Sequence, residues 1–317
     1  MKLVTFQYKN VVSIGHLTED NKIIDFVNFS NGKLPNRMDL FLEQGEYNSI
    51  SARKIAAESS IATLRLSQVN LLAPILNVPS LRGGYAFREH VEIGRKFRGM
   101  EMIPEYDKFP VFYFANHNTI IGPGPVIVQD EHLPKLDFEL ECAIVIGKKG
   151  KNIKAEHADQ YIAGYTILND WSARHLQSEE MKLNFGPVKG KDFATSIGPY
   201  IVTQDELELF RIPGTDGDRY NLKMTAKING VQVSEDNLQN MYWTFAQIIE
   251  RASMGTSLYP GDIIGSGTCK TGCLMEHNLK KKTQHTWLKD GDAVELSIDG
   301  LGTLKNTIEI DKEKDDE

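Results

Sequence analysis

The sequence has few cysteines, and their spacing gives them no evident structural task. Cys142, Cys269 and Cys273 are the three cysteines in 317 residues, an odd number without a Cys-x-x-Cys pair. A disulfide framework and a cysteine-rich zinc ribbon are therefore not expected, and a reducing compartment fits this usage.

Two further absences narrow the class of protein. No apolar run approaches the roughly 20 residues that a membrane-spanning helix requires, and residues 1–6 lack the features of a secretory signal. Basic residues are not in excess, since 36 Lys and Arg stand against 43 Asp and Glu, a formal net charge of −7. We therefore expect a cytoplasmic protein with neither a nucleic-acid partner nor a membrane partner.

The composition, 41% hydrophobic and 25% charged, is ordinary for a globular protein. Near the start, apolar and β-branched runs predict strands over residues 2–8, 11–17 and 22–26. Helical spacing follows over 38–44 and 49–66, and two prolines within 69–79 indicate a linker. We expect a small N-terminal domain at 1–75, a larger domain at 76–309 and a disordered tail at 310–317, where no apolar residue follows Ile310.

The larger part of the chain is richer in strands than in helices. Predicted strands lie at 111–114, 126–128, 139–146, 165–168, 200–203, 223–228, 262–265 and 293–298, and predicted helices at 156–163 and 242–252. This mixture favours a β-rich α+β fold with a mixed sheet over a doubly wound sheet.

An acidic row stands directly before an apolar strand. In Asp137-Phe138-Glu139-Leu140-Glu141, strand alternation predicts that the three acids share one face. Solvated surface charge is the simplest alternative. However, the row enters a run that resembles a buried strand, and burying unpaired carboxylates is costly. A hard divalent cation among them would resolve this conflict.

A third candidate ligand follows another strand. Asp170 comes directly after the apolar run 165–168, at a strand end, and its alternative role is to cap the next helix. Together with Glu139 and Glu141 it would offer three carboxylates to Mg²⁺ or Mn²⁺. Oxygen-only ligation indicates a metal that acts as a Lewis acid.

These segments together resemble a known family. Asp-Phe-Glu-Leu-Glu at 137–141, Asn-Asp-Trp-Ser-Ala-Arg at 169–174 and Lys-Gly-Lys-Asp-Phe at 189–193 resemble the fumarylacetoacetate hydrolase family, over roughly residues 80–308. The resemblance implies Glu139, Glu141 and Asp170 as metal ligands. It also implies a mixed β-roll core with a small N-terminal α/β domain, and a homodimer. Asp137 then becomes a residue of the strand entry or a support to the ligands.

The resemblance also implies a catalytic pair. His90 and Glu276 match the positions of the His and Glu that activate water in fumarylacetoacetases. Smaller relatives instead carry His-x-x-Glu, but the residue three after His90 is Ile93, so that only Glu89 or Glu92 could substitute. By themselves, His90 could be a surface histidine on a charged helix and Glu276 an exposed strand residue.

Other site residues carry over in the same way. The resemblance assigns stabilisation of an oxyanion to Lys191, Arg174 and Gln177, and substrate binding to Arg98, Tyr113 and Thr268. Two departures stand out: residues 81–85 lack the fourth acidic ligand of animal fumarylacetoacetases, and His175 replaces the usual Asp after Ser-Ala-Arg. A three-carboxylate site is therefore expected, with Arg174 reoriented or His175 lining the pocket.

We interpret the sequence first as a Mg²⁺-dependent hydrolase that cleaves a carbon–carbon bond in a 3,5-dioxo acid. Fumarylacetoacetate, which would give fumarate and acetoacetate in tyrosine or other aromatic catabolism, is the expected substrate. The alternatives on the same fold are a 2-oxo acid decarboxylase, an acylpyruvate hydrolase and a 2-hydroxydienoate isomerase. A binding protein that kept the metal site without turnover is a rival of another class.

Overall fold

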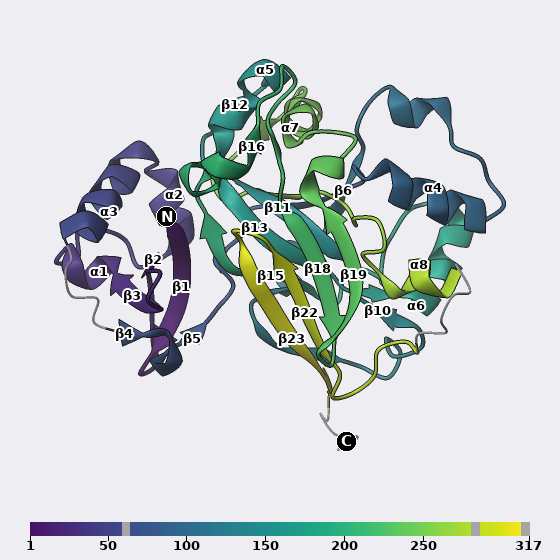
Figure 1. Ribbon diagram of the computed structural model, residues 1–317, viewed down its shortest axis with the longest axis horizontal. Helices are drawn as coiled ribbons and strands as arrows, with labels where there is room; N and C mark the ends of the chain where they lie inside the picture. Colours follow the sequence, from purple (N-terminus) through teal and green to yellow (C-terminus); the bar gives the residue numbers. More distant parts are fainter. Residues whose placement is uncertain (59–63, 280–285, 312–317) are drawn as a thin grey trace.

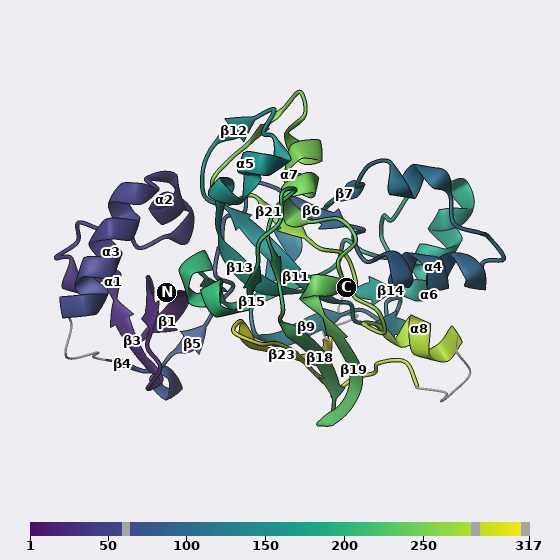
Figure 2. The ribbon, with the colours of Figure 1, turned by 45° about the horizontal axis from the view of Figure 1, so that its top comes forward.

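The protein is described by a computed structural model, which places residues 1–58, 64–279 and 286–311. It is a β-rich α+β fold with a mixed main sheet, so the predicted fold class is confirmed. Figure 1 shows the N-terminal strands and helices at one side of the molecule, and α4, α6 and α8 at the other. Figure 2 shows the same separation after rotation.

The main sheet runs through the whole molecule in the order β4-β3-β2-β1-β15-β13-β11-β21-β6-β7, while β5 pairs with β1 and β8 with β15. Its strands, in chain order, are β1 (Lys2–Tyr8), β2 (Val11–Leu17), β3 (Lys22–Asp25), β4 (Leu64–Arg65), β5 (Asn70–Leu71), β6 (Leu81–Gly84), β7 (Phe112–Ala115), β8 (Ile120–Ile121), β11 (Leu140–Ile146), β13 (Ile162–Asp170), β15 (Thr195–Val202) and β21 (Ile263–Gly265).

A second sheet packs against the first, with strand order β19-β18-β22-β23-β9. Its members are β9 (Gly124–Val128), β18 (Lys223–Ile228), β19 (Val231–Asn237), β22 (Ala293–Ile298) and β23 (Gly302–Ile310). Three short ladders pair β10 (Leu136–Asp137) with β14 (Ser172–Ala173), β12 (Gly150–Lys151) with β20 (Ser257–Leu258), and β16 (Arg211–Ile212) with β17 (Arg219–Tyr220).

The α-helices are short and lie outside the sheets (Figure 1). They are α1 (Phe26–Phe29), α2 (Met38–Glu43), α3 (Glu46–Glu58), α4 (Arg88–Phe97), α5 (Ala155–Ala158), α6 (Arg174–Glu180), α7 (Phe245–Ser253) and α8 (Leu274–Leu279). The best capped is α7, where Thr244 and Gln247 form a reciprocal capping box.

The largest apolar core lies between the two sheets. Ile144 and Ile167 of the main sheet meet Leu296 and Leu304 of the second sheet there, all fully buried. A second core packs the N-terminal helices onto the main sheet. Since β1 pairs with β15, the predicted N-terminal domain shares a sheet with the rest, and the domain limits stay a prediction.

Several sequence expectations need correction. Phe26 begins α1 instead of ending a strand, because Asp25 caps that helix through the backbone N–H groups of Val27 and Asn28. The helix expected at 49–66 ends at Glu58; residues 59–63 lie outside the described residues, and Leu64–Arg65 forms β4. The expected linker at 69–79 contains β5, which pairs with β1.

Two more corrections concern the larger part of the chain. The helix expected at 156–163 is the short α5, because residues from 162 join the buried strand β13. Strands β19 and β23 were not predicted as strands. Ile310 ends β23, and residues 312–317 of the expected tail lie outside the described residues.

Candidate functional site: three carboxylates beside a histidine–glutamate pair

The three predicted metal ligands meet where two antiparallel strands pair. Glu141 of β11 lies opposite Leu168 of β13, Glu139 directly precedes β11, and Asp170 ends β13. One carboxylate oxygen of each acid lies within 4.8 Å of those of the other two, and all three residues are buried. Glu139 and Glu141 thus come from one run of the sequence, and the register of the strand pair adds Asp170 to them.

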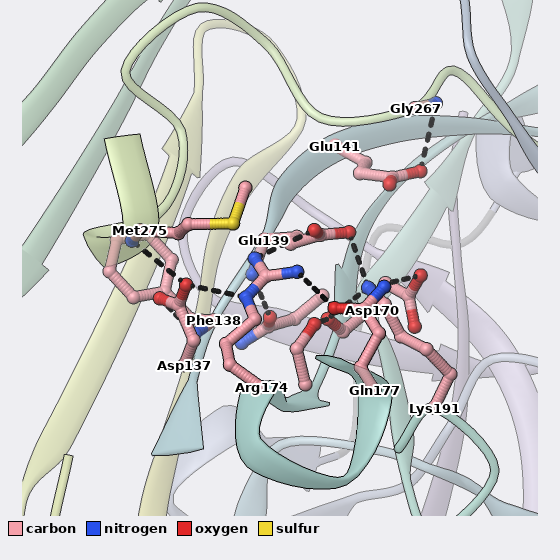
Figure 3. Close-up of polar contacts among 12 residues, drawn as sticks. Asp137, Phe138, Glu139, Glu141, Asp170, Arg174, Gln177, Lys191, Gly267 and Met275 are labelled. Atoms are coloured by element: carbon pink, nitrogen blue, oxygen red, sulfur yellow. Dashed lines mark hydrogen bonds and ion pairs between the residues drawn. The ribbon is translucent and has the colours of Figure 1, made fainter. Parts of the chain in front are cut away.

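Two cationic side chains form ion pairs with the cluster and compensate part of its negative charge. Lys191 Nζ lies 2.6 Å from Glu139 Oε2 and 2.9 Å from Asp170 Oδ2. Arg174 Nη2 forms an ion pair with Glu139 Oε1 at 2.8 Å, while its Nη1 donates to Gln177 Oε1 at 3.0 Å. Figure 3 shows that Lys191 and Arg174 reach Glu139 from the side of α6.

The pKa shifts differ among the three acids, although all three are buried. Burial opposes the charge on Glu139, but Lys191 and Arg174 outweigh it and hold its pKa below the ordinary value. Burial, reinforced by Asp170 and Glu139, raises the pKa of Glu141 well above the ordinary value. Burial also raises the pKa of Asp170, against the opposing charge of Lys191. The carboxylate of Glu141 is thus the least compensated charge of the cluster.

The donor set fits a hard divalent cation. Asp170 Oδ1 is buried without a hydrogen-bond partner, and Glu141 Oε2 accepts one hydrogen bond at 3.0 Å from the N–H of Gly267. Oxygen donors alone are the ligands that Mg²⁺ and Mn²⁺ prefer. In the described part of the chain the group consists of three carboxylates, and strand β6 contains no acidic residue.

Backbone shape allows this close approach. Gly267 has φ +81°, and a Cβ there would lie 2.7 Å from the carbonyl oxygen of Gly84. A side chain at this position would displace the N–H that binds Glu141. Gly83 similarly makes room for the ring of Tyr113, which a Cβ would approach to 2.3 Å.

The predicted histidine–glutamate pair forms in the structure. His90 Nδ1 and Glu276 Oε1 lie 2.5 Å apart, and both side chains are buried. His90 lies on α4, and Glu276 lies on α8 rather than on an exposed strand. The second oxygen of Glu276 accepts from the N–H of Thr271 at 3.1 Å. The carboxylate therefore has the position needed to fix the histidine tautomer.

Asp137 does not belong to the acidic cluster. The expectation that it shares a face with Glu139 is wrong, because Asp137 lies in β10 and the chain leaves strand geometry at residues 138 and 139 before β11 begins. Asp137 instead accepts from Arg174 Nε at 2.9 Å and from the N–H of Met275 at 3.0 Å (Figure 3). It also accepts from the N–H of Leu274 at 2.7 Å. It therefore joins Arg174 to the start of α8.

The three residues predicted to bind substrate are Tyr113, Thr268 and Arg98. Tyr113 donates from its hydroxyl to Asp170 Oδ2 at 2.7 Å, so it supports a predicted ligand. Thr268 is buried three residues after β21 ends. Arg98 is exposed at the end of α4, where its Nε donates to the carbonyl of Gly94 at 3.1 Å.

His175 is exposed on α6, whereas Arg174 is fixed by Asp137, Glu139 and Gln177. The replacement of the usual Asp by His175 thus leaves Arg174 anchored by other partners.

Sequence reasoning missed two groups. Tyr85 is a half-buried side chain whose ring meets that of His90 edge-on, with centroids 6.3 Å apart. Burial raises the pKa of Tyr85, the charge of Arg98 opposes this rise, and the charge of Glu139 adds to it. Tyr85 therefore lies near His90, Arg98 and Glu139. Cys273, set aside because it lacked a partner cysteine, lies with His90 and Glu276. A tyrosine shortly before a candidate histidine was the available signal for the first.

Comparison with known proteins agrees with this geometry. The family model described as fumarylacetoacetate hydrolase, C-terminal, matches residues 81–309. The mitochondrial oxaloacetate tautomerase fahd2 of Xenopus laevis is 33% identical over 97% of this chain and 90% of that protein. The oxaloacetate tautomerase YisK of Bacillus subtilis is 29% identical over 97% of this chain and 100% of that protein.

Solved structures show the same fold. The fumarylacetoacetate hydrolase of Exiguobacterium antarcticum superposes with a TM-score of 0.71 at 24% identity, covering 98% of this chain and 99% of that one. The maleylpyruvate hydrolase of Sphingobium sp. SYK-6, in complex with manganese(II) and pyruvate, has a TM-score of 0.71 at 21% identity with the same coverage. The chain is therefore an enzyme of the fumarylacetoacetate hydrolase family.

Proposed function

We propose that this enzyme is a divalent-metal-dependent tautomerase that interconverts the enol and keto forms of a 2-oxo acid of the oxaloacetate class. The observation that carries the proposal is the buried His90–Glu276 pair beside a cluster of three oxygen ligands. Against the effect of burial, Lys191, Arg174 and, to a lesser degree, His90 lower the pKa of Glu139, so the pair lies near the cluster. Relatives named as oxaloacetate tautomerases match 97% of the chain, which supports this choice over carbon–carbon hydrolysis.

Glu139, Glu141 and Asp170 would hold the cation. When bound, a divalent cation polarises the 2-oxo group and so makes the protons on the neighbouring carbon, C3, more acidic. Lys191 and Arg174 favour the charged form of Glu139, which is the form that binds a cation. Tyr113 and Lys191 both bond to Asp170 Oδ2, which fixes the side chain and leaves Oδ1 without a protein partner.

His90 then acts as the proton carrier. Its Nδ1–H donates to Glu276, which leaves Nε2 as the basic nitrogen. In the keto-to-enol direction Nε2 takes a proton from C3, the C3–H electron pair forms the C2–C3 double bond, and the 2-oxygen receives a proton. Glu276 stabilises the imidazolium that exists between the two transfers. One proton moves from carbon to oxygen, and water is not consumed.

A second candidate uses the same residues for hydrolysis. If a water molecule replaces C3–H as the proton donor to His90, the resulting hydroxide attacks a ketone of a 3,5-dioxo acid. The carbon–carbon bond then breaks, its electron pair leaves with the second fragment as an enolate, and that enolate takes the proton from His90. The paired His90 and Glu276 favour this candidate, because the family resemblance assigns water activation to that pair. Decarboxylation of a 2-oxo acid remains the third possibility on this fold.

The experiment follows enol-oxaloacetate by its ultraviolet absorbance in the presence of Mg²⁺. We expect the wild type to accelerate loss of the enol, and His90→Ala to abolish this acceleration. His175→Ala is the matched control, because it removes an exposed imidazole from α6 and should keep the wild-type rate. Two results together would overturn the tautomerase proposal in favour of the hydrolase. The wild type would fail to accelerate the conversion, and it would release fumarate and acetoacetate from fumarylacetoacetate.

Three further properties stay predictions. The predicted metal is Mg²⁺ or Mn²⁺, because three carboxylates suit both ions. A homodimer follows from the family resemblance alone. The sequence predicts the cytosol, whereas relatives are named as mitochondrial; no helix in the described residues is long and apolar enough to cross a membrane.

A further inference from the structure

A thiol lies directly beside the histidine–glutamate pair. One ligand atom from each of His90, Cys273 and Glu276 lies within 4.8 Å of those of the other two, and all three residues are buried. Cys273 directly precedes α8, which carries Glu276, and His90 comes from α4. Two separate elements thus bring nitrogen, sulfur and oxygen donors to one point.

This cluster differs in chemistry from the carboxylate cluster. Sulfur and imidazole nitrogen select borderline-soft ions such as Zn²⁺, whereas Mg²⁺ prefers oxygen alone. Three protein ligands are also the usual number in a zinc site that keeps a fourth position open.

The anchoring of the cluster supports a fixed geometry. Asp137 accepts from the N–H groups of Leu274 and Met275, which fixes the backbone directly after Cys273. Glu276 is held by His90 on one oxygen and by the N–H of Thr271 on the other. Ligands whose backbone is held in this way need little backbone rearrangement to accept an ion, which would replace the hydrogen bond between His90 and Glu276.

We propose that His90, Cys273 and Glu276 form a second, inhibitory metal site that binds Zn²⁺. On binding, a Zn–S bond replaces the S–H bond and the thiol proton leaves to solvent. The ion binds Nδ1, the nitrogen that faces Glu276, so the imidazole proton moves from Nδ1 to Nε2 and His90 can no longer accept a proton from a substrate. Binding at this site does not depend on which reaction the enzyme catalyses, and Mg²⁺ does not compete for it.

The test uses the full chain with Mg²⁺ in excess and Co²⁺ or Zn²⁺ as the added ion. We expect Co²⁺ to produce a thiolate-to-metal charge-transfer band in the near ultraviolet, and Zn²⁺ to remove that band by displacement. Cys273→Ser should abolish the band and weaken Zn²⁺ binding, measured by calorimetry, by more than about 100-fold, beyond the 10–100-fold typical of losing an outer-shell partner.

Cys269→Ala is the matched control, because Cys269 is equally buried but lies outside the cluster. It should keep both the band and the affinity, and circular dichroism would verify that each variant is folded. The proposal is overturned if the folded wild type gives no thiolate band, or if Cys273→Ser binds Zn²⁺ as tightly as the wild type.

Discussion

Asp137 gives the sharpest test of how the site is supported. Its carboxylate is fully buried and accepts four hydrogen bonds, from the N–H groups of Phe138, Leu274 and Met275 at 2.9, 2.7 and 3.0 Å, and from Arg174 Nε at 2.9 Å. Asp137→Ala would leave the N–H groups of Leu274 and Met275, at the start of α8, without their acceptor. It would also remove the carboxylate that pairs with Arg174. We therefore expect a large loss of stability together with a loss of activity.

The magnitude follows from the ion pair. Breaking a buried pair by removing one partner typically costs about 3–5 kcal/mol, because the other charge is left uncompensated. Arg174 keeps Glu139 at 2.8 Å, so the lower part of that range, about 3 kcal/mol, is expected in the free energy of unfolding. Loss of the acceptors at the helix start contributes about 1 kcal/mol within this figure.

Urea denaturation of the wild type and of Asp137→Ala, both with Mg²⁺, measures this difference. Asp20→Ala is the control, since Asp20 is exposed and paired with an exposed Lys22 at 2.7 Å, and it should change the free energy of unfolding very little. A loss below about 1 kcal/mol for Asp137→Ala would refute the argument, because that is the typical effect of an arbitrary substitution.

The remaining predictions concern the carboxylate cluster. Tyr113→Phe removes the hydroxyl that donates to Asp170 at 2.7 Å, and calorimetry should show Mg²⁺ affinity falling by about 10–100-fold; an unchanged affinity would exclude this support. Gly265→Ala places a Cβ 2.6 Å from Glu141 Oε2, so this variant should lose Mg²⁺ binding in the same assay, whereas Gly230→Ala, in open space on a turn, should keep it. The raised pKa of Glu141 makes its contribution to stability fully present below its ordinary pKa of 4.5 and lost as pH rises. In chelator, the melting temperature of the wild type should therefore fall with rising pH more than that of Glu141→Gln; equal slopes would contradict the shift.

Much of the fold follows from local pattern. Strands β1, β2, β18 and β22 match the apolar and β-branched runs residue for residue, since each run is bounded by turns. The site residues could be predicted only as a set, through the family resemblance, because His90 and Glu276 are 186 residues apart and no local pattern links them.

The features that could not be predicted depend on long-range contacts. Asp137 continues the alternation of Glu139 and Glu141, yet its pairing in β10 with β14 and its bonds to α8 remove it from their face. Glu276 reads as a strand residue locally, but it lies on the short helix α8, whose start is stabilised by Asp137. In both cases a tertiary hydrogen bond overrides the local preference.

The most direct test of the central claim is deuterium incorporation at C3 of oxaloacetate, followed by NMR in D₂O with Mg²⁺. The account predicts that the wild type accelerates exchange at C3 over the metal alone without cleaving the carbon chain, and that His90→Ala does not. Exchange that is equally fast with the wild type, with His90→Ala and with Mg²⁺ alone would contradict the assignment of His90 as the proton carrier.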